Sequence, residues 1–144
     1  PFEPASIGQL LDSGRITGVS LVPSMLASVL DARTDSPFPE ALRFLLVGGG
    51  PMPDTLRERC QRLALPVALT WGFTEAASQV ATCFPGELGA GEGCGPPLPF
   101  ARVEEEEGRL LVRGPLVGDA PWLTGDVGRV GPEDVSLCGD ECAR

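Results

Sequence analysis

The sequence predicts an α/β protein in which a layer of parallel strands and helices is followed by a small β-rich, barrel-like lobe. In the first half, β-rich apolar runs alternate with segments whose apolar residues recur at helical spacing. In the second half the helical period does not return, and glycine and proline separate short β-rich runs. With 144 residues, 42% of them hydrophobic, the chain suffices for one ordinary domain or two small lobes. We expect an α/β part over residues 1–86 and a β lobe over residues 87–144.

The first elements alternate helix, strand and helix. Apolar residues at helical spacing predict a helix over residues 4–11, and a β-rich run over 16–22 predicts a strand that Pro23 ends. Apolar residues three and four apart then predict a helix over 25–30, with Ser24 as its N-cap. This order is the one that a βα unit requires.

A second strand and helix follow, and then a third strand. The stretch "LRFLLVGGG", residues 42–50, is a nearly continuous apolar run, typical of a strand buried on both faces of a parallel sheet. Residues 53–63 predict a helix, in which Thr55 and Glu58 have the spacing of a capping box. Residues 65–72, "LPVALTWG", predict the third strand.

The second half predicts a connection and two hairpins. Residues 85–99 are rich in glycine and proline and are typical of a link between lobes. Residues 100–114 predict a hairpin with its turn near Gly108, and residues 122–130 followed by 134–139 predict another. The four consecutive glutamates within the first hairpin are most simply a solvated edge, and we assign them no function.

The charged residues exclude several classes of function. The net charge is −9, all eleven cations are arginine, and lysine, histidine and tyrosine are absent, so a nucleic-acid partner would meet net repulsion. Without histidine or lysine there is no Ser-His relay, no Schiff base and no phosphate-gripping lysine. Any catalysis must use Asp, Glu, hydroxyls or groups from elsewhere. No apolar run reaches the roughly 18 residues that a membrane span needs.

The cysteines indicate the cellular compartment of the protein, and the first residue indicates whether the sequence is a fragment. The five cysteines form no C-x-x-C pair and lack the further ligands of a zinc site, so we expect reduced thiols in a cytoplasmic protein. The chain begins with Pro1 rather than methionine, and we expect a fragment, processed or cut from a longer protein. Its assembly state, including a homodimer, stays open.

Two predicted strand ends carry residues suited to a ligand. In open α/β sheets, ligands gather at the carboxyl ends of parallel strands, and we expect these two ends to face one cleft. The first strand end continues into Gly48, Gly49 and Gly50, which would let a flat ligand approach the backbone closely. The alternative for the glycines is a tight strand-to-helix turn.

The second strand end is "WGFTEAASQV", residues 71–80. Trp71 offers a broad face on which a base can stack, and Thr74 can donate to a phosphate oxygen. Glu75 is a hard oxygen ligand, and Mg2+ on phosphates typically needs only one or two protein carboxylates. The alternative is a core tryptophan followed by the start of a surface helix.

A third element is "PWLTGDVG", in which Asp126 follows Thr-Gly between two β-rich runs. A carboxylate there can accept both hydroxyls of a ribose, although Gly-Asp is also ordinary turn chemistry. Taken together, the three elements supply a base slot, a phosphate contact, a metal ligand and a ribose clamp. They predict an ATP site.

The chain resembles the adenylate-forming acyl-CoA synthetases over nearly all of its length. The blocks that carry the resemblance, in order, are "VSLVPSML", "LRFLLVGGGPMP", "LPVALTWGFTEAASQVAT", "CGPPLP", "GRLLVRGP" and "WLTGDVG". Within the third block, Ser78 and Gln79 point to the branch of menaquinone biosynthesis that activates o-succinylbenzoate, and they are the expected substrate residues. The resemblance implies that the chain is part of the large N-terminal domain of such an enzyme.

The resemblance also implies individual roles. Thr74 would contact the α-phosphate and Glu75 would bind Mg2+, and these two are the expected catalytic residues. Asp126 would hold the ribose. The base would be bordered by Gly48, Gly49, Gly50, Trp71 and Gly72, with Trp71 at the family's usual stacking-tyrosine position. The implied partners are ATP, coenzyme A and a small carboxylate.

The sequence departs from the family in ways that affect the expected activity. The family's upstream phosphate loop and its lysine are absent, as is the lysine of its mobile C-terminal domain. Where its Gly-Arg-x-Asp hinge is expected, Asp140 follows glycine. The leading hypothesis is a carboxylate-CoA ligase of which this chain alone makes no acyl-CoA. The alternative is a noncatalytic adenine-nucleotide-binding or interaction module derived from the family.

Overall fold

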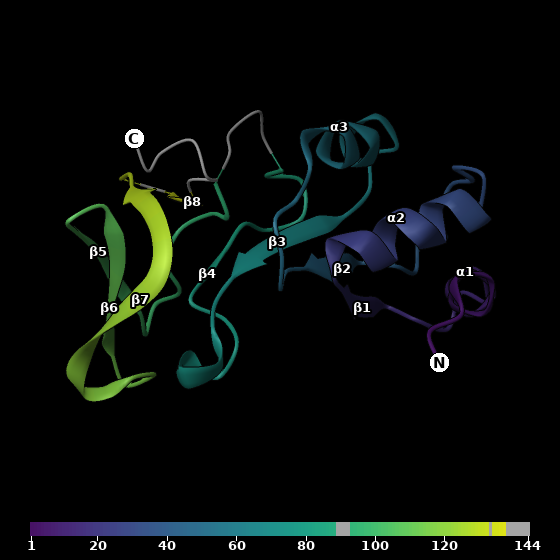
Figure 1. Ribbon diagram of the computed structural model, residues 1–144. Helices are drawn as coiled ribbons and strands as arrows, with labels where there is room; N and C mark the ends of the chain where they lie inside the picture. Colours follow the sequence, from purple (N-terminus) through teal and green to yellow (C-terminus); the bar gives the residue numbers. More distant parts are fainter. Residues whose placement is uncertain (89–92, 133, 138–144) are drawn as a thin grey trace. The chain divides into compact units, whose positions relative to one another are not determined.

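The computed structural model describes residues 1–88, 93–132 and 134–137 (Figure 1). Its helices are α1 (Pro4–Asp12), α2 (Pro23–Ala32), α3 (Asp54–Arg62) and the short 3-10 helix η1 (Thr74–Ala76). Its strands are β1 (Gly18–Leu21), β2 (Phe44–Val47), β3 (Val67–Trp71), β4 (Ala81–Thr82), β5 (Arg102–Glu106), β6 (Arg109–Gly114), β7 (Gly118–Val130) and β8 (Val135–Leu137). The chain divides into two compact units, residues 1–68 with 84–88 and residues 69–83 with the described residues from 93 onward, so that β3 contributes to both.

The first unit is the predicted α/β layer. Strands β1 and β2 pair in parallel, from Gly18 opposite Phe44 to Leu21 opposite Val47, with α2 as the crossover between them. The start of β3 follows through a hydrogen bond of 2.7 Å from Leu45 N to Pro66 O. Each leucine buried in such a core stabilises the fold by about 1.5–3 kcal/mol. The fully buried side chains of this unit include Leu11, Leu26, Val29, Leu30, Leu45, Val47 and Val67.

Strand β2 corrects one expectation about burial. Its side chains alternate between the two faces of the sheet, and Leu45 and Val47 are fully buried on one of them. Phe44 is 44% exposed, so the prediction of a strand buried on both faces is wrong at this position. The Phe44 ring lies against Gly18, which has no side chain to cover it further.

The starts of two helices also differ from the sequence prediction. Helix α2 begins at Pro23 itself, with Val22 as N-cap and no side-chain cap, so the assignment of Ser24 as N-cap is wrong. Proline favours the first helical position because its φ is already helical and it has no N–H to leave unpaired. Helix α3 has Pro53 as its N-cap and no side-chain cap, so the capping box beginning at Thr55 is wrong: this residue is already inside the helix.

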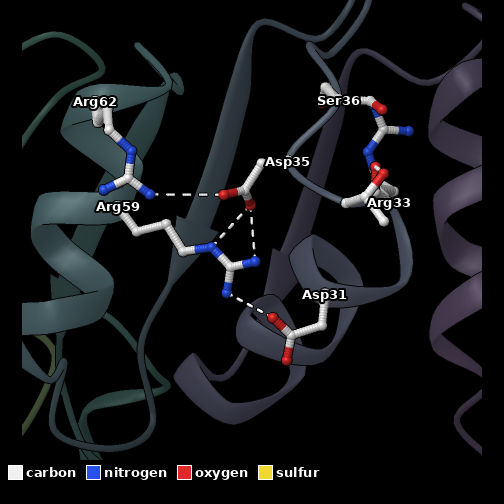
Figure 2. A network of polar contacts seen from close by, with 7 residues as sticks. Asp31, Arg33, Asp35, Ser36, Arg59 and Arg62 are labelled. Atoms are coloured by element: carbon white, nitrogen blue, oxygen red, sulfur yellow. Dashed lines mark hydrogen bonds and ion pairs between the residues drawn. The ribbon is translucent and has the colours of Figure 1, made fainter.

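Arg59 of α3 ties its helix to α2 and to the loop after α2, as Figure 2 shows. Its Nε and Nη2 lie 2.8 and 2.7 Å from Oδ1 of Asp35, and its Nη1 lies 2.7 Å from Oδ1 of Asp31. Arg62 adds a contact of 3.5 Å to Asp35. The hydrogen bond from Arg59 is the largest cause that lowers the pKa of Asp35 below its ordinary value, and the same bond raises the pKa of Arg59. Ion pairs therefore link α3 to α2 and to the loop after it.

Arg33, directly after α2, is a buried charge with several partners. It pairs with Asp12 of α1, and its Nη2 donates to the carbonyls of Ser36 and Pro37 at 3.1 and 2.7 Å. The ring of Phe38 lies 4.0 Å from the guanidinium carbon. These groups replace most of the water that the guanidinium loses, so the charge is tolerated inside the unit, although among the described residues its Nε is buried without a hydrogen-bond partner.

The second unit contains the predicted β-rich lobe. Its antiparallel sheet has the order β5-β6-β7-β8, and Figure 1 shows how strongly β7 bends. Between β5 and β6, Glu107 and Gly108 have φ values of 50° and 77°, and a type I′ turn requires positive φ at both positions. The hairpin predicted near Gly108 is confirmed, and so is the one made by β7 and β8.

Several sequence predictions concern parts that the structure does not test. The boundary between residues 86 and 87 stays a prediction. The hinge at Asp140 and the thiols of Cys138 and Cys142 lie outside the described residues. In the described part of the chain, no helix is long and apolar enough to cross a membrane, and the longest, α2, has 10 residues.

Candidate functional site

The loop after β3 places Thr74 and Glu75 side by side at the surface of the second unit. Both side chains are exposed and belong to the 3-10 helix η1. Backbone hydrogen bonds fold the loop on itself: Ser78 N donates to Phe73 O at 3.2 Å, and Val80 N donates to Trp71 O at 2.9 Å. The hydroxyl and the carboxylate are therefore held on a closed loop, where a phosphate and its metal ion can reach them.

Two features of this loop explain its sequence. A Cβ atom on Gly72 would lie 1.6 Å from the carbonyl oxygen of Ser78, so only glycine fits where the loop closes. The close approach of this carbonyl therefore explains why residue 72 is glycine without any contact to a ligand. Ala77 and Ser78 have φ values of 53° and 104°, uncommon for residues other than glycine. Backbone strain of this kind clusters at functional sites, and nothing in the residue types had indicated it.

Trp71 lies inside the second unit, with an exposed fraction of 4%. Its indole Nε1–H donates to Oδ2 of Asp126 at 2.9 Å, and its ring centroid lies 6.0 Å from that of Phe73. Little of the Trp71 ring is open for a base to stack on. The burial agrees with the alternative of a core tryptophan, while the hydrogen bond adds a polar role that neither interpretation contained. The stacking role stays a prediction.

Asp126 lies on a bulge of β7. Leu111 of β6 is opposite Leu123, but Arg109 is opposite Val127, so β7 advances four residues while β6 advances two. Asp126 is one of the residues between these pairs. Bulges re-aim side chains and are frequent next to active sites. The bulge accounts for a half-buried carboxylate that leaves the regular alternation of the strand.

Thr124 is a site residue that the sequence analysis missed. Its side chain is buried, and its hydroxyl donates to Leu110 O at 2.8 Å and accepts from Asp126 N at 3.2 Å. The hydroxyl thereby fixes the backbone of the bulge from inside the sheet. Threonine two residues before an aspartate is a signal for such side-chain turns, and it was present in "LTGD".

Ser78 and Gln79, the expected substrate residues, differ in their surroundings. Ser78 is exposed on the closed loop. Gln79 is half-buried, and its Nε2 donates to the hydroxyl of Thr70 at 3.4 Å, which lies 2.9 Å from the hydroxyl of Thr82. The structure thus gives Gln79 polar partners within the protein, and a role toward a substrate stays a prediction for both residues.

Gly48, Gly49 and Gly50 follow β2 in the first unit. Gly49 has a φ of 75°, in the left-handed region that favours glycine, and it is exposed together with Gly50. A Cβ on Gly49 would lie 3.4 Å from Val22 Cγ1, an ordinary contact. The backbone conformation explains the middle glycine as a turn, and the proposed approach of a base to all three stays a prediction.

The electrostatics of the second unit single out Asp126. Among the residues that the structure describes, the Asp126 carboxylate takes its hydrogen bond from Trp71 and pairs with no arginine. The described residues also contain no cluster of three acidic or cysteine side chains that could hold a metal ion. A magnesium ion at Glu75 would accordingly depend on phosphate oxygens and water for its other ligands, as is common for this ion.

The described cysteines do not suggest a nucleophile. Cys60 is fully buried on α3, and burial raises the pKa of its thiol to about 11, so it stays protonated at neutral pH. Cys83 is also buried, and its Sγ accepts a hydrogen bond from Leu69 N at 3.1 Å. Covalent catalysis by Cys60 is therefore not supported.

The fold and the site define a class of protein: a mixed α/β chain whose third strand ends in an exposed Thr-Glu loop, and whose antiparallel lobe presents an aspartate on a bulge. The chain belongs to the AMP-binding enzyme family, whose model matches residues 1–120. The resemblance to adenylate-forming synthetases is thereby confirmed, and so is the α/β fold class with its curled antiparallel sheet.

Individual relatives are similar over most of this chain. It is 33% identical over 135 residues to the 2-succinylbenzoate–CoA ligase of Geobacillus kaustophilus (strain HTA426), covering 84% of this chain and 27% of that protein. A double mutant of Bacillus subtilis o-succinylbenzoate CoA synthetase, bound to a product analogue, superimposes with a TM-score of 0.84 at 27% identity, covering 95% of this chain and 34% of that one. The same synthetase in complex with ATP and magnesium ion has a TM-score of 0.80 at 28% identity, with coverage of 94% and 34%. The chain thus spans between a quarter and about a third of the length of these relatives.

Proposed function

We propose that this chain forms part of the nucleotide-binding domain of a cytoplasmic carboxylate-CoA ligase that acts on o-succinylbenzoate. In the first step a carboxylate oxygen of the acid attacks the α-phosphorus of ATP, and pyrophosphate leaves. In the second step the sulfur of coenzyme A attacks the acyl carbon, the thiol proton is lost, and AMP leaves. The named ligands of the relatives, ATP with magnesium and a CoA product analogue, support this pair of steps.

The observation that carries the proposal is the hydrogen bond between Trp71 and Asp126. These residues are 55 positions apart, and each belongs to one of the three elements that together predict an ATP site. A core tryptophan needs no carboxylate beside it, and a surface turn needs no buried indole. This hydrogen bond places the Thr-Glu loop, which begins after Trp71, next to the aspartate on the bulge of β7, and both belong to the second unit.

Each proposed role follows from the chemistry of the side chain. Asp126 accepts the hydroxyls of the ribose, and Thr74 donates to an oxygen of the α-phosphate. Glu75 is the residue that would hold Mg2+, whose chemistry is to neutralise charge on the phosphate oxygens. The protein contributes orientation and charge stabilisation rather than a covalent nucleophile. Further proposed contacts are Gly48, Gly49, Gly50, Trp71 and Gly72 with the base, and Ser78 and Gln79 with the acid.

A second candidate function is a nucleotide-binding or interaction module without ligase activity. The two functions differ in turnover: a ligase produces pyrophosphate and acyl-CoA, and a module only binds nucleotide.

The test is made on the protein at its native length, with o-succinylbenzoate, ATP, Mg2+ and coenzyme A. We expect pyrophosphate release in the wild type, and Glu75→Gln to lower kcat/KM by about a hundredfold, since one lost electrostatic contact in the transition state costs about 2.7 kcal/mol. The matched control is Glu105→Gln, an exposed glutamate of β5 in the same unit. Its kcat/KM should stay within about twofold of the wild-type value.

The other outcomes separate the alternatives. AMP binding without any turnover would favour the noncatalytic module. Turnover confined to fatty acids would place the protein in another branch of the family. Equal kcat/KM values for Glu75→Gln and Glu105→Gln would remove Glu75 from the magnesium site.

A further inference from the structure

Trp71 occupies a position at which the family resemblance implies a stacking face, but its contacts in this chain point to a different task. Its exposed fraction is 4%, and the ring of Phe73 lies at an angle of 48° beside it. A ring this enclosed has fixed rotamers and offers its polar edge in one direction only. That edge, the indole N–H, donates to Oδ2 of Asp126 at 2.9 Å.

The position of Asp126 is thereby determined from two sides. Its backbone N–H donates to the buried hydroxyl of Thr124 at 3.2 Å, which fixes the bulge. Its side chain is fixed by Trp71 alone among the described residues. A carboxylate has about four lone-pair sites, and one indole N–H occupies only one of them. Oδ1 and one lone pair of Oδ2 stay available for further donors.

The neutrality of the indole matters for the strength of those further bonds. An arginine at the same place would form an ion pair and compete for both oxygens, whereas an indole N–H orients the group and leaves its full negative charge. Hydrogen bonds to an ionised acceptor are roughly twice as strong as neutral ones. A pre-oriented, unpaired carboxylate is suited to two neighbouring hydroxyls such as those of a ribose.

We propose that Trp71 is a positioning residue that holds the Asp126 carboxylate in the orientation in which it accepts ribose hydroxyls. This inference rests on the proposed function, because it takes the ribose contact of Asp126 from there. It assigns the tryptophan a role through its N–H, distinct from stacking on the base.

The test compares two ligands that differ only in the ribose hydroxyls. AMP and 2′,3′-dideoxy-AMP are titrated calorimetrically into the native-length protein and into Trp71→Phe, Asp126→Asn and the double variant. We expect Trp71→Phe to weaken AMP by about three- to tenfold and dideoxy-AMP by less than twofold, the effect of one hydrogen bond to a charged group acting indirectly. In the Asp126→Asn background the same substitution should change AMP affinity by less than twofold.

Trp122→Phe is the matched control, because Trp122 is the other tryptophan of this chain, is 41% exposed and does not donate to Asp126. Phenylalanine there keeps an aromatic ring beside Phe73, on which Trp122 stacks at 6.5 Å. It should bind AMP within about twofold of the wild type. If Trp71→Phe weakened both ligands equally, stacking on the base would explain the effect and the positioning role would be overturned. Unchanged AMP affinity would overturn it as well. If wild type bound no AMP at all, the proposed function itself would fail, an outcome distinct from a Trp71→Phe variant that behaves like wild type.

A second measurement covers the case in which Trp71→Phe does not fold. In 15N spectra of the wild type, the indole resonance of Trp71 is assigned by its displacement in Asp126→Asn. We expect AMP to shift this resonance and to slow its exchange with solvent, and dideoxy-AMP to do so much less. An equal response to both ligands, or none to AMP, would overturn the proposal.

Discussion

Asp35 and Asp126 are both aspartates in irregular segments, but the groups that donate to their carboxylates differ. Asp35 lies between the guanidinium groups of Arg59 and Arg62, and its pKa is lowered chiefly by the hydrogen bond from Arg59 (Figure 2). Asp126 accepts one hydrogen bond from a neutral indole and meets no arginine among the described residues.

The difference separates a structural carboxylate from one suited to a ligand. The charge of Asp35 is matched inside the first unit, where it links α3 to the loop after α2. The charge of Asp126 is oriented but has no cationic partner among the described residues, so a ligand hydroxyl gains a strong acceptor without displacing any of their cations. Side-chain type alone does not distinguish the two aspartates, whereas their donors do.

Among these predictions, the largest effect is expected on the stability of the first unit, from the substitution of Arg33. We expect Arg33→Met to lower the free energy of unfolding by about 2–4 kcal/mol, because it removes a buried, paired charge and leaves the carbonyls of Ser36 and Pro37 without their donor. Urea unfolding of the native-length protein measures it. The control is the exposed Arg43→Met, expected within about 0.5 kcal/mol of wild type. A loss of unfolding free energy no larger than that of Arg43→Met would show that the paired charge of Arg33 does not stabilise this unit.

The next largest effect concerns AMP binding by Asp126. Asp126→Asn keeps the shape of the side chain but removes its charge, and we expect AMP affinity to fall by about tenfold or more, with a change in unfolding free energy of about 1 kcal/mol or less. Calorimetry and urea unfolding measure the two quantities. Asp119→Asn, an exposed aspartate on the same strand β7, is the control. Equal AMP affinities of the two variants would return Asp126 to ordinary turn chemistry.

The smallest effect concerns Asp35 and depends on pH. Because its pKa is lowered in the folded state, its contribution to stability is present above the ordinary carboxyl pKa of about 4 and is lost as the pH falls through the lowered value. We expect Asp35→Asn to be less stable than wild type at pH 7, and this difference in stability to disappear once the pH falls below the lowered pKa of Asp35. Unfolding midpoints at the two pH values test this. A gap that persisted in acid would assign the effect to shape rather than charge.

Local patterns predicted most of the elements correctly. The helical spacing near the N-terminus, the apolar run before the glycines and the turn at Gly108 depend on neighbours in the chain, and the structure confirms them. The predicted caps at Ser24 and Thr55 were wrong, because each helix begins at or directly after a proline and has no side-chain cap. The length of β7, from Gly118 to Val130, was underestimated because its first residues carry little β-rich pattern.

By itself, the sequence determined which chemistry is available. It contains a Thr-Glu pair after an apolar strand, a Gly-Asp pair between two β-rich runs, and no lysine or histidine, and these follow from residue types alone. The tertiary structure decided how those groups are used. Trp71 is turned inward with its N–H on Asp126, Thr124 holds the bulge, and Gly72 admits the carbonyl of Ser78. Contacts between residues 55 positions apart leave no local pattern, because burial and bulge geometry arise only when the strands have paired.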